Sequence, residues 1–137
     1  MLEAHGATVM MSRTENRDED DRNLTEIAEE ASANSMDAFL SIHSNAVGVN
    51  QGTNYLLLLY RGTDDEPDPA LSKPMAQACW SRMYDNPLTN WTYYSATNMN
   101  VRGDYSFYGY HLGVLRNNTV PGFLSEGEFH DYLPETH

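Results

Sequence analysis

Two residues of the chain, His43 and Glu126, stand where α/β proteins place reactive side chains. His43 lies at the carboxyl end of a predicted strand, within Ser-Ile-His-Ser-Asn-Ala, whose small polar residues leave the imidazole accessible. Glu126 follows a short apolar run from Gly122 to Ser125. An imidazole is a common zinc ligand, and a buried or metal-adjacent carboxylate can serve as a general acid or base. Taken singly, each is equally explained as a structural or exposed side chain.

The remaining histidines are weaker candidates for metal ligands. A zinc site needs three convergent protein ligands, and no pair of histidines here shows the i, i+4 spacing of a helical site. His130 is close in sequence to Glu126 and could instead contact a substrate. The others are His5, His111 and His137.

Two nucleophile classes are disfavoured. Cys79 is the only cysteine, so neither an internal disulfide nor a cysteine-based zinc cluster can form. It belongs to an apolar helical pattern, which predicts a packed thiol. Ser41 and Ser44 flank His43, but the chain has no Gly-x-Ser-x-Gly turn of a serine hydrolase.

Aromatic residues concentrate between the predicted second helix and the last strands. They either pack a long loop onto the domain, which is the favoured interpretation because buried aromatics dominate core energetics, or form the walls of a glycan or peptide cleft. They are Trp91, Tyr93, Tyr94, Tyr105, Phe107, Tyr108 and Tyr110.

The elements that must position these residues alternate between strand and helix patterns. Period-two and apolar runs predict strands at 7–11, 38–43, 55–60, 113–116 and 122–125. Capping residues and helical spacing predict helices from about Leu24 to Ser35, after Asn23, and from Ser72 to about Tyr84. Residues 86–111 lack periodicity and are predicted to be a long structured loop. This alternation predicts an α/β fold with a mostly parallel central sheet and helices on both faces.

Size and charge limit the class of protein. A chain of 137 residues is long enough for one compact domain, 1–137, and too short for two ordinary ones. Its formal net charge of −12 would repel a phosphate backbone, so nucleic acid is not an expected partner. The chain shows neither a signal peptide nor an apolar run long enough to span a bilayer.

The first residues resemble the end of a helix, closed by Gly6 and running into the strand at 7–11. A strand so near the terminus needs neighbours to pair with. We therefore expect further sequence upstream, and an exposed sheet edge that could drive self-association in its absence.

Two segments, 41–46 (Ser-Ile-His-Ser-Asn-Ala) and 120–129 (Val-Pro-Gly-Phe-Leu-Ser-Glu-Gly-Glu-Phe), resemble the C-terminal signatures of zinc-dependent N-acetylmuramoyl-L-alanine amidases. Gly-Ala-Thr-Val at 6–9, leading into Ser-Arg-Thr at 12–14, is similar to that family's second strand. The resemblance extends from Gly6 to about Glu135. Its usual Asp-x-Gly-His-Gly-Gly strand end and the following helical glutamate are absent, and Ile27 stands where the family often has arginine.

The resemblance implies that His43 is a Zn²⁺ ligand and Glu126 the catalytic residue of an enzyme that hydrolyses the bond between N-acetylmuramic acid and L-alanine. Peptidoglycan would be the partner, outside the cytoplasm, with Arg102 and Arg116 as candidate contacts for a stem-peptide carboxylate. The first strand and helix of the family fold would lie upstream of Met1, so these residues alone are expected to be impaired in activity. Two alternatives remain: a non-catalytic peptidoglycan-binding module of the same fold, and another metal-dependent peptidase or deacetylase.

Overall fold

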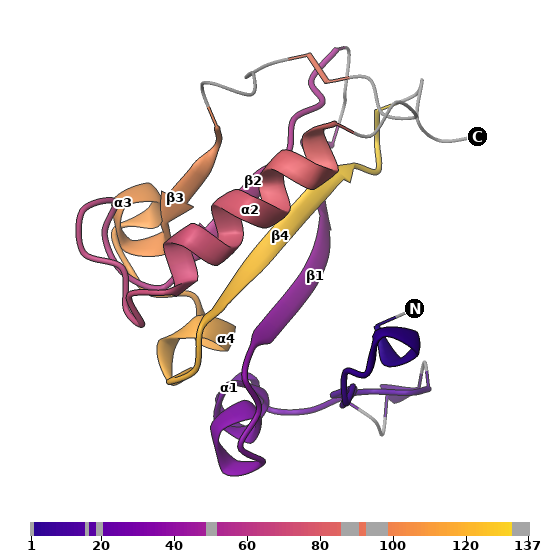
Figure 1. Ribbon diagram of the computed structural model, residues 1–137. Helices are drawn as coiled ribbons and strands as arrows, with labels where there is room; N and C mark the ends of the chain where they lie inside the picture. The colour runs from indigo at the N-terminus through magenta and orange to yellow at the C-terminus, as the bar shows by residue number, and fades with distance from the viewer. Residues whose placement is uncertain are drawn as a thin grey trace.

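A four-stranded sheet with helices on both faces forms the centre of the computed structural model, which describes residues 2–15, 17–18, 21–48, 52–85, 91–92 and 99–132 (Figure 1). Its strand order is β1-β4-β2-β3. The strands are β1 (Phe39–Asn45), β2 (Leu57–Tyr60), β3 (Val101–Gly103) and β4 (Gly122–Phe129). The helices are η1 (Glu3–His5), α1 (Leu24–Ala33), α2 (Ser72–Tyr84), α3 (Asp104–Tyr108) and α4 (Gly113–Arg116).

Two of the three strand pairs in this sheet are parallel. β1 pairs with β4 and β2 pairs with β3 in parallel, whereas β2 and β4 run antiparallel. Because β1 and β4 are parallel, their carboxyl ends meet at the same edge of the sheet. The predicted α/β fold with a mostly parallel sheet and helices on both faces is therefore confirmed.

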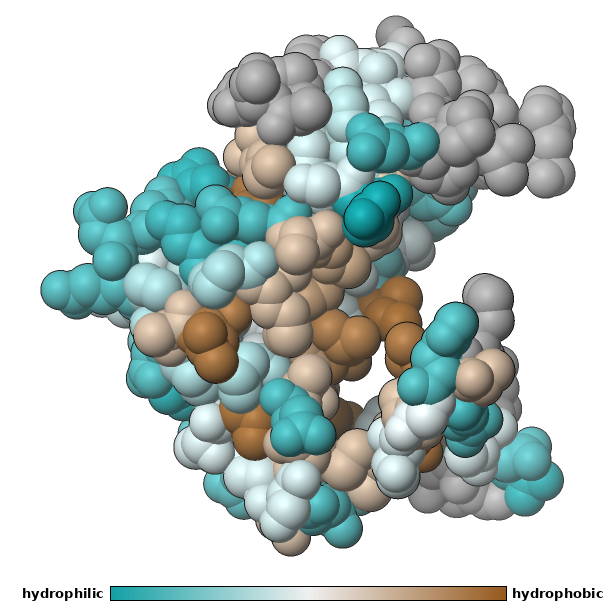
Figure 2. All heavy atoms as spheres, in the orientation of Figure 1, coloured by the Kyte–Doolittle hydropathy of each residue, from teal (hydrophilic) through white to brown (hydrophobic). Residues whose placement is uncertain are grey.

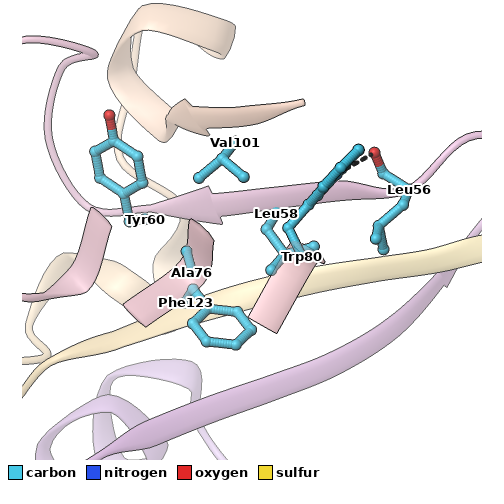
Figure 3. Packing of buried hydrophobic residues seen from close by; sticks show 7 residues of the cluster. All are labelled: Leu56, Leu58, Tyr60, Ala76, Trp80, Val101 and Phe123. Atoms are coloured by element: carbon cyan, nitrogen blue, oxygen red, sulfur yellow. Dashed lines mark hydrogen bonds between the residues drawn. The ribbon is translucent and has the colours of Figure 1, made fainter. Parts of the chain in front are cut away.

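The long helix α2 covers one face of the sheet, over β2, β3 and β4 (Figure 1). Trp80 is fully buried there, and its indole N–H donates to the carbonyl oxygen of Leu56 at 3.3 Å (Figure 3). Its ring stacks on Tyr84, with centroids 4.6 Å apart. The rest of this cluster consists of Leu58, Tyr60, Ala76, Val101 and Phe123. An indole buried with its N–H satisfied stabilises a core without an unpaired donor.

The opposite face is covered by the short helices α1 and α4. Leu57, Leu59 and Leu124 project from the sheet into a cluster with Val114 and Leu115 of α4. Ile27 of α1, with Phe39, Tyr55 and Leu112, packs around this cluster. Asn23 caps α1 as predicted, because its side chain accepts a hydrogen bond from the backbone N–H of Thr25.

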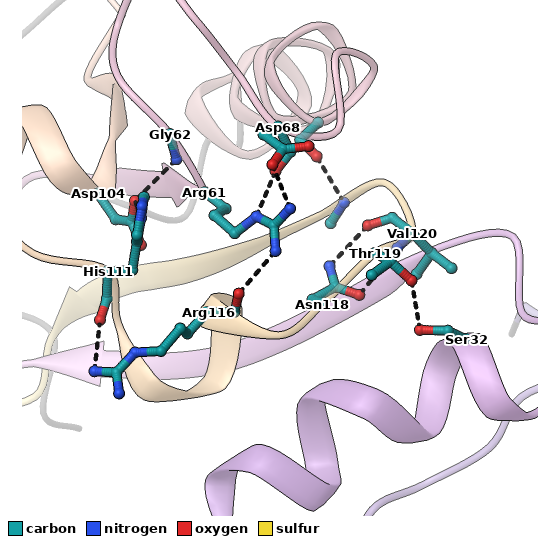
Figure 4. A network of polar contacts seen from close by, with 12 residues as sticks. Ser32, Arg61, Gly62, Asp68, Asp104, His111, Arg116, Asn118, Thr119 and Val120 are labelled. Atoms are coloured by element: carbon teal, nitrogen blue, oxygen red, sulfur yellow. Dashed lines mark hydrogen bonds and ion pairs between the residues drawn. The ribbon is translucent and has the colours of Figure 1, made fainter.

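Buried Asp104 ties the end of β2 to the turn between α3 and α4 (Figure 4). Its carboxylate accepts hydrogen bonds from the backbone N–H groups of Gly62 and Leu112 at 3.0 and 2.9 Å. His111 Nδ1 lies 3.0 Å from the same carboxylate. Gly103 must be glycine here, since an added Cβ would lie 2.4 Å from the backbone of Gly62 and Thr63.

Three sequence-based element predictions were wrong. Residues 7–11 form no strand: the segment is exposed and no described strand pairs with it. Residues 113–116 form helix α4, because the carbonyl oxygen of Leu112 accepts from the N–H groups of Leu115 and Arg116. The described part of the predicted loop 86–111 contains β3 and α3. No described helix has both the length and the apolar character needed to cross a membrane.

Candidate active site

His43 and Glu126 are direct partners in the parallel register of β1 and β4. Side chains at paired positions of neighbouring strands project from the same face of a sheet, so the imidazole and the carboxylate lie side by side. Glu126 is also opposite Leu57 of β2. Leu57 and Leu124 both project into the cluster beneath α4. His43 and Glu126 therefore lie on the same face of the sheet as this cluster, nearer to the carboxyl ends of β1 and β4.

The carboxylate of Glu126 is partly buried, and its Oε2 has no hydrogen-bond partner among the described residues. Burial raises the pKa of Glu126, and nearby His43 opposes this in part. A desolvated carboxylate with a free oxygen binds a proton more readily than one in water. That is the property required of a general base that must also release the proton.

The imidazole of His43 is exposed, and Ser41 holds it from the same face of β1. His43 Nε2 lies 3.0 Å from Ser41 Oγ. Such a contact fixes the orientation of the ring and leaves Nδ1 as the other ring nitrogen available to a ligand.

A β-bulge directly follows the paired residues. The register passes from His43↔Glu126 to Asn45↔Phe129, so β4 contains one residue more than β1 over this step. Bulges occur next to active sites, where they redirect side chains. The buried side chain of Asn54 accepts from the backbone N–H of Phe129 at 3.1 Å and so secures the end of the bulge.

The other histidines do not join this pair. His130 Nδ1 lies 3.1 Å from Ser44 Oγ, and Ser44 is adjacent to His43 and hence projects from the other face of β1. His111 contacts Asp104, beyond the opposite ends of the sheet, and His5 is exposed in η1. His137 lies outside the described residues.

The described residues around His43 and Glu126 form only part of a metal-binding site. The described residues contain no group of three His, Cys, Asp or Glu side chains that could hold one. A catalytic zinc ion takes three protein ligands and a water molecule. His43 fits as one ligand and Glu126 as a neighbouring base, but the described residues do not complete the coordination sphere.

A family model described as N-acetylmuramoyl-L-alanine amidase matches residues 1–133. The chain belongs to the N-acetylmuramoyl-L-alanine amidase family. No curated protein sequence matches the chain significantly.

Solved structures with this amidase fold are similar over nearly the whole chain. The catalytic domain of CwlV, an N-acetylmuramoyl-L-alanine amidase from Bacillus (Paenibacillus) polymyxa var. colistinus, is 20% identical, with a TM-score of 0.61 over 94% of this chain and 59% of its own. Cwp6 from Clostridium difficile is 24% identical, with a TM-score of 0.70 over 98% of this chain and 19% of its own. AmiC2 of Nostoc punctiforme is 21% identical, with a TM-score of 0.62 over 98% of this chain and 62% of its own. The chain thus spans less than two thirds of each of these proteins.

Several candidates from the sequence have structural roles in this amidase-family chain. The Cys79 thiol packs 3.7 Å from the sulfur of Met83, and burial raises its pKa, as expected of a packed thiol. The guanidinium of Arg102 donates to Asp64 at 2.7 Å, and that of Arg116 donates to the carbonyl oxygen of His111. Arg102 is opposite Leu59 of β2, on a strand that is not adjacent to β1 or β4.

The predicted packing of the aromatic residues is confirmed for only part of them. Trp91 packs on Tyr84 next to α2, whereas Tyr105, Phe107, Tyr108 and Tyr110 are exposed in and after α3. Tyr93 and Tyr94 lie outside the described residues. Tyr55 was missed, although its place two residues before Leu57 puts it on the face that contains Glu126.

Proposed function

We propose that the chain is part of a zinc-dependent enzyme that hydrolyses the amide bond between N-acetylmuramic acid and L-alanine in peptidoglycan. The observation that carries this proposal is the register pairing of His43 with Glu126 within an amidase-family chain. His43 would be one ligand of the zinc ion and Glu126 the catalytic carboxylate. Peptidoglycan lies outside the cytoplasm, so the protein would act there.

Glu126 performs the proton transfers in this scheme. Its carboxylate accepts a proton from the attacking water, whose oxygen bonds to the amide carbonyl carbon. The carbon–nitrogen bond then breaks, and Glu126 returns the proton to the leaving amine of L-alanine. The products are the lactyl carboxylate and a free peptide, and the carboxylate is regenerated. A zinc ion, held in part by His43, would act as a Lewis acid that polarises the carbonyl group and lowers the pKa of water.

The described residues provide too few metal ligands for a complete zinc site. Because the described residues contain no group of three metal-binding side chains, we expect this chain by itself to bind zinc weakly and to turn over little substrate. The same observation favours a second candidate, a non-catalytic peptidoglycan-binding module of the same fold. Hydrolysis by the protein as its organism produces it decides between the two.

Product analysis separates the amidase from another metal-dependent peptidase or deacetylase. An amidase must release a peptide that begins with a free L-alanine, whereas the other activities leave the lactyl–alanine bond intact. Muropeptides are therefore the substrate for the test, with new N-terminal alanine as the readout and Glu126→Gln as the inactive variant. Absence of new N-terminal alanine would rule out the proposed reaction.

We also propose that the β1 edge supports self-association. β1 is an outer strand of the four-stranded sheet, and its Leu40 and Ile42 are 47% and 82% exposed. Figure 2 shows hydrophobic side chains gathered beside a gap that separates the N-terminal segment from the body of the molecule. An exposed apolar strand edge is a template for pairing with another chain.

A further inference from the structure

The loop after β1 is tied to the turn after β4 by the carboxylate of Asp131. Its Oδ2 accepts hydrogen bonds from the backbone N–H groups of Val47 and Gly48, at 2.9 and 2.8 Å. These two residues are consecutive, and Gly48 has a φ of +84°, in the left-handed region. Consecutive N–H groups in such a turn form a concave donor site that one oxygen atom can fill. Asp131 therefore fixes the conformation of a loop that is otherwise exposed.

Two further contacts join the same segments. The backbone N–H of His130 donates to the carbonyl oxygen of Asn45 at 3.0 Å. The Nδ1 of the same histidine lies 3.1 Å from Ser44 Oγ. Together with the hydrogen bonds of Asp131, these contacts form a clasp between residues 44–48 and the two residues that follow β4.

The clasp lies immediately beyond the candidate site. His43 and Glu126 are paired, but β4 contains one residue more than β1 before the next pair, Asn45 with Phe129. A bulge interrupts the regular pairing of two strands and bends one of them. β1 is also an outer strand of the described sheet and is paired there with β4 alone. The contacts of the clasp are therefore the ones that close this pairing again on the far side of the bulge.

We infer that Asp131 is a positioning residue, which holds the carboxyl end of β1 against β4 and so sets the separation of His43 and Glu126. Its effect on catalysis rests on the proposed function, whereas the clasp itself is a property of the fold. A displacement of a catalytic group by about 1 Å can lower a rate about 100-fold. Asp131 acts through the backbone of β1 and its loop and takes no part in the proton transfers.

Kinetics of alanine release by the zinc-loaded protein, as its organism produces it, test the effect on the site. Asp131→Ala should lower kcat about 10-fold or more with KM within about twofold, because Glu126 acts in the transition state. Asp131→Asn keeps an oxygen that can accept from both N–H groups, and should restore kcat to within about threefold of the natural value. Asp37→Ala is the matched control and should leave kcat unchanged, because Asp37 is exposed just before the opposite end of β1.

Gly48→Ala changes the other partner of the clasp. An added Cβ at Gly48 meets no atom within 4 Å, but a φ of +84° strains any residue with a side chain. The substitution should turn the N–H groups of the loop away from Asp131 and reproduce the fall in kcat. The double variant should fall no further than Asp131→Ala alone, since both changes remove one interaction. Additive losses would mean that the two residues act separately, which contradicts the inference.

Amide hydrogen exchange, followed by NMR in the whole chain without zinc, measures the clasp without turnover. Asp131→Ala should speed exchange at Val47 and Gly48 about 10-fold or more, the value of a hydrogen bond to a charged group. Exchange should also become faster at residues 41–45, which lose their closure beyond the bulge. Asp131→Asn and Asp37→Ala should exchange like the natural chain. Faster exchange confined to Val47 and Gly48 would show a local contact that does not hold β1, and would overturn the inference.

The kinetic results also separate this inference from the proposed function. A natural kcat in Asp131→Ala, or an equal loss in Asp131→Asn or Asp37→Ala, would reject the positioning role. If alanine release at the same time depends on Glu126, the amidase stands without it. If the natural protein releases no alanine, the proposed function fails, and hydrogen exchange at residues 41–45 alone decides whether Asp131 holds β1 against β4.

Discussion

Glu126 on β4 is the direct register partner of His43 on β1, and it is opposite Leu57 on β2 as well. The carboxylate thus lies between an exposed imidazole on one side and a fully buried leucine on the other. This position explains the raised pKa of Glu126, because the apolar neighbour removes water from the carboxylate. The imidazole on the other side places a metal-binding side chain next to it. A reactive group held on a strand is positioned more rigidly than one on a loop.

Glu126→Gln should stabilise the zinc-free chain, and the gain should grow with pH. Burial raises the pKa of Glu126 in the folded chain, so the folded state holds its proton more tightly than the unfolded state does. The favourable contribution is present at low pH and is lost as pH rises through the folded pKa. Urea unfolding with a chelator at about pH 4 and about pH 7 measures this. Exposed Glu128→Gln is the control, and an equal effect of Glu126→Gln at both pH values would contradict the expectation.

Asp104→Asn should destabilise the fold without involving the site. The carboxylate accepts from two backbone N–H groups and faces His111, and an amide retains only one acceptor oxygen. Loss of one hydrogen bond to a charged group costs about 1.5–3 kcal/mol. Thermal or urea unfolding would measure this loss, with exposed Asp65→Asn as control. Equal stability of the two variants would show that the hydrogen bonds of Asp104 to Gly62 and Leu112 do not stabilise the fold.

Trp80→Ala should be among the most damaging substitutions under α2. Trp80 is fully buried between α2 and the sheet, and truncation leaves a cavity as well as an unpaired carbonyl oxygen at Leu56. Such substitutions cost about 3–5 kcal/mol. Trp80→Phe keeps a ring and should lose less. A loss below about 1 kcal/mol in urea unfolding of Trp80→Ala would contradict this packing.

Ile42→Lys should suppress self-association through the β1 edge. A lysine on an edge strand opposes pairing with another strand, because its charge would have to be desolvated. Sedimentation velocity over a range of concentrations should show association of the natural chain and a monomer for Ile42→Lys. Leu71→Lys, at an exposed position at the start of α2, should associate like the natural chain. A natural chain that stays monomeric throughout would refute the proposal.

Local sequence patterns predicted the helices and strands whose periodicity or capping residues lie within the element itself. The second helix ends at Tyr84 as predicted, but Leu71 is its N-cap, and the Ser72 hydroxyl, which was expected to cap the helix, accepts from the backbone N–H of Gly122 instead. The strand containing His43 differs from the prediction only at its ends. The segment 113–116 was predicted as a strand because Val114 and Leu115 are apolar, but four residues cannot distinguish a strand from one helical turn. The apolar segment 7–11 reads as a strand, yet a strand forms only beside a partner, and no described strand pairs with it.

The site was predictable only in part, for a related reason. Each of the two segments that contain His43 and Glu126 has a recognisable pattern, but their register is a long-range property that no local pattern encodes. The same holds for Tyr55, whose place on the face that contains Glu126 depends on the pairing of β2 with β4. The sequence shows which residues could do chemistry, whereas the strand pairing of the sheet determines which of them lie next to each other.

The most direct test of the central claim is release of N-terminal L-alanine from muropeptides by the zinc-loaded protein as its organism produces it. Glu126→Gln should reduce the rate at least about 100-fold, the lower limit of a general base contribution, whereas Glu128→Gln should stay within about twofold of the natural protein. A Glu126→Gln variant that releases alanine at the natural rate would contradict the assignment of Glu126 as the catalytic carboxylate.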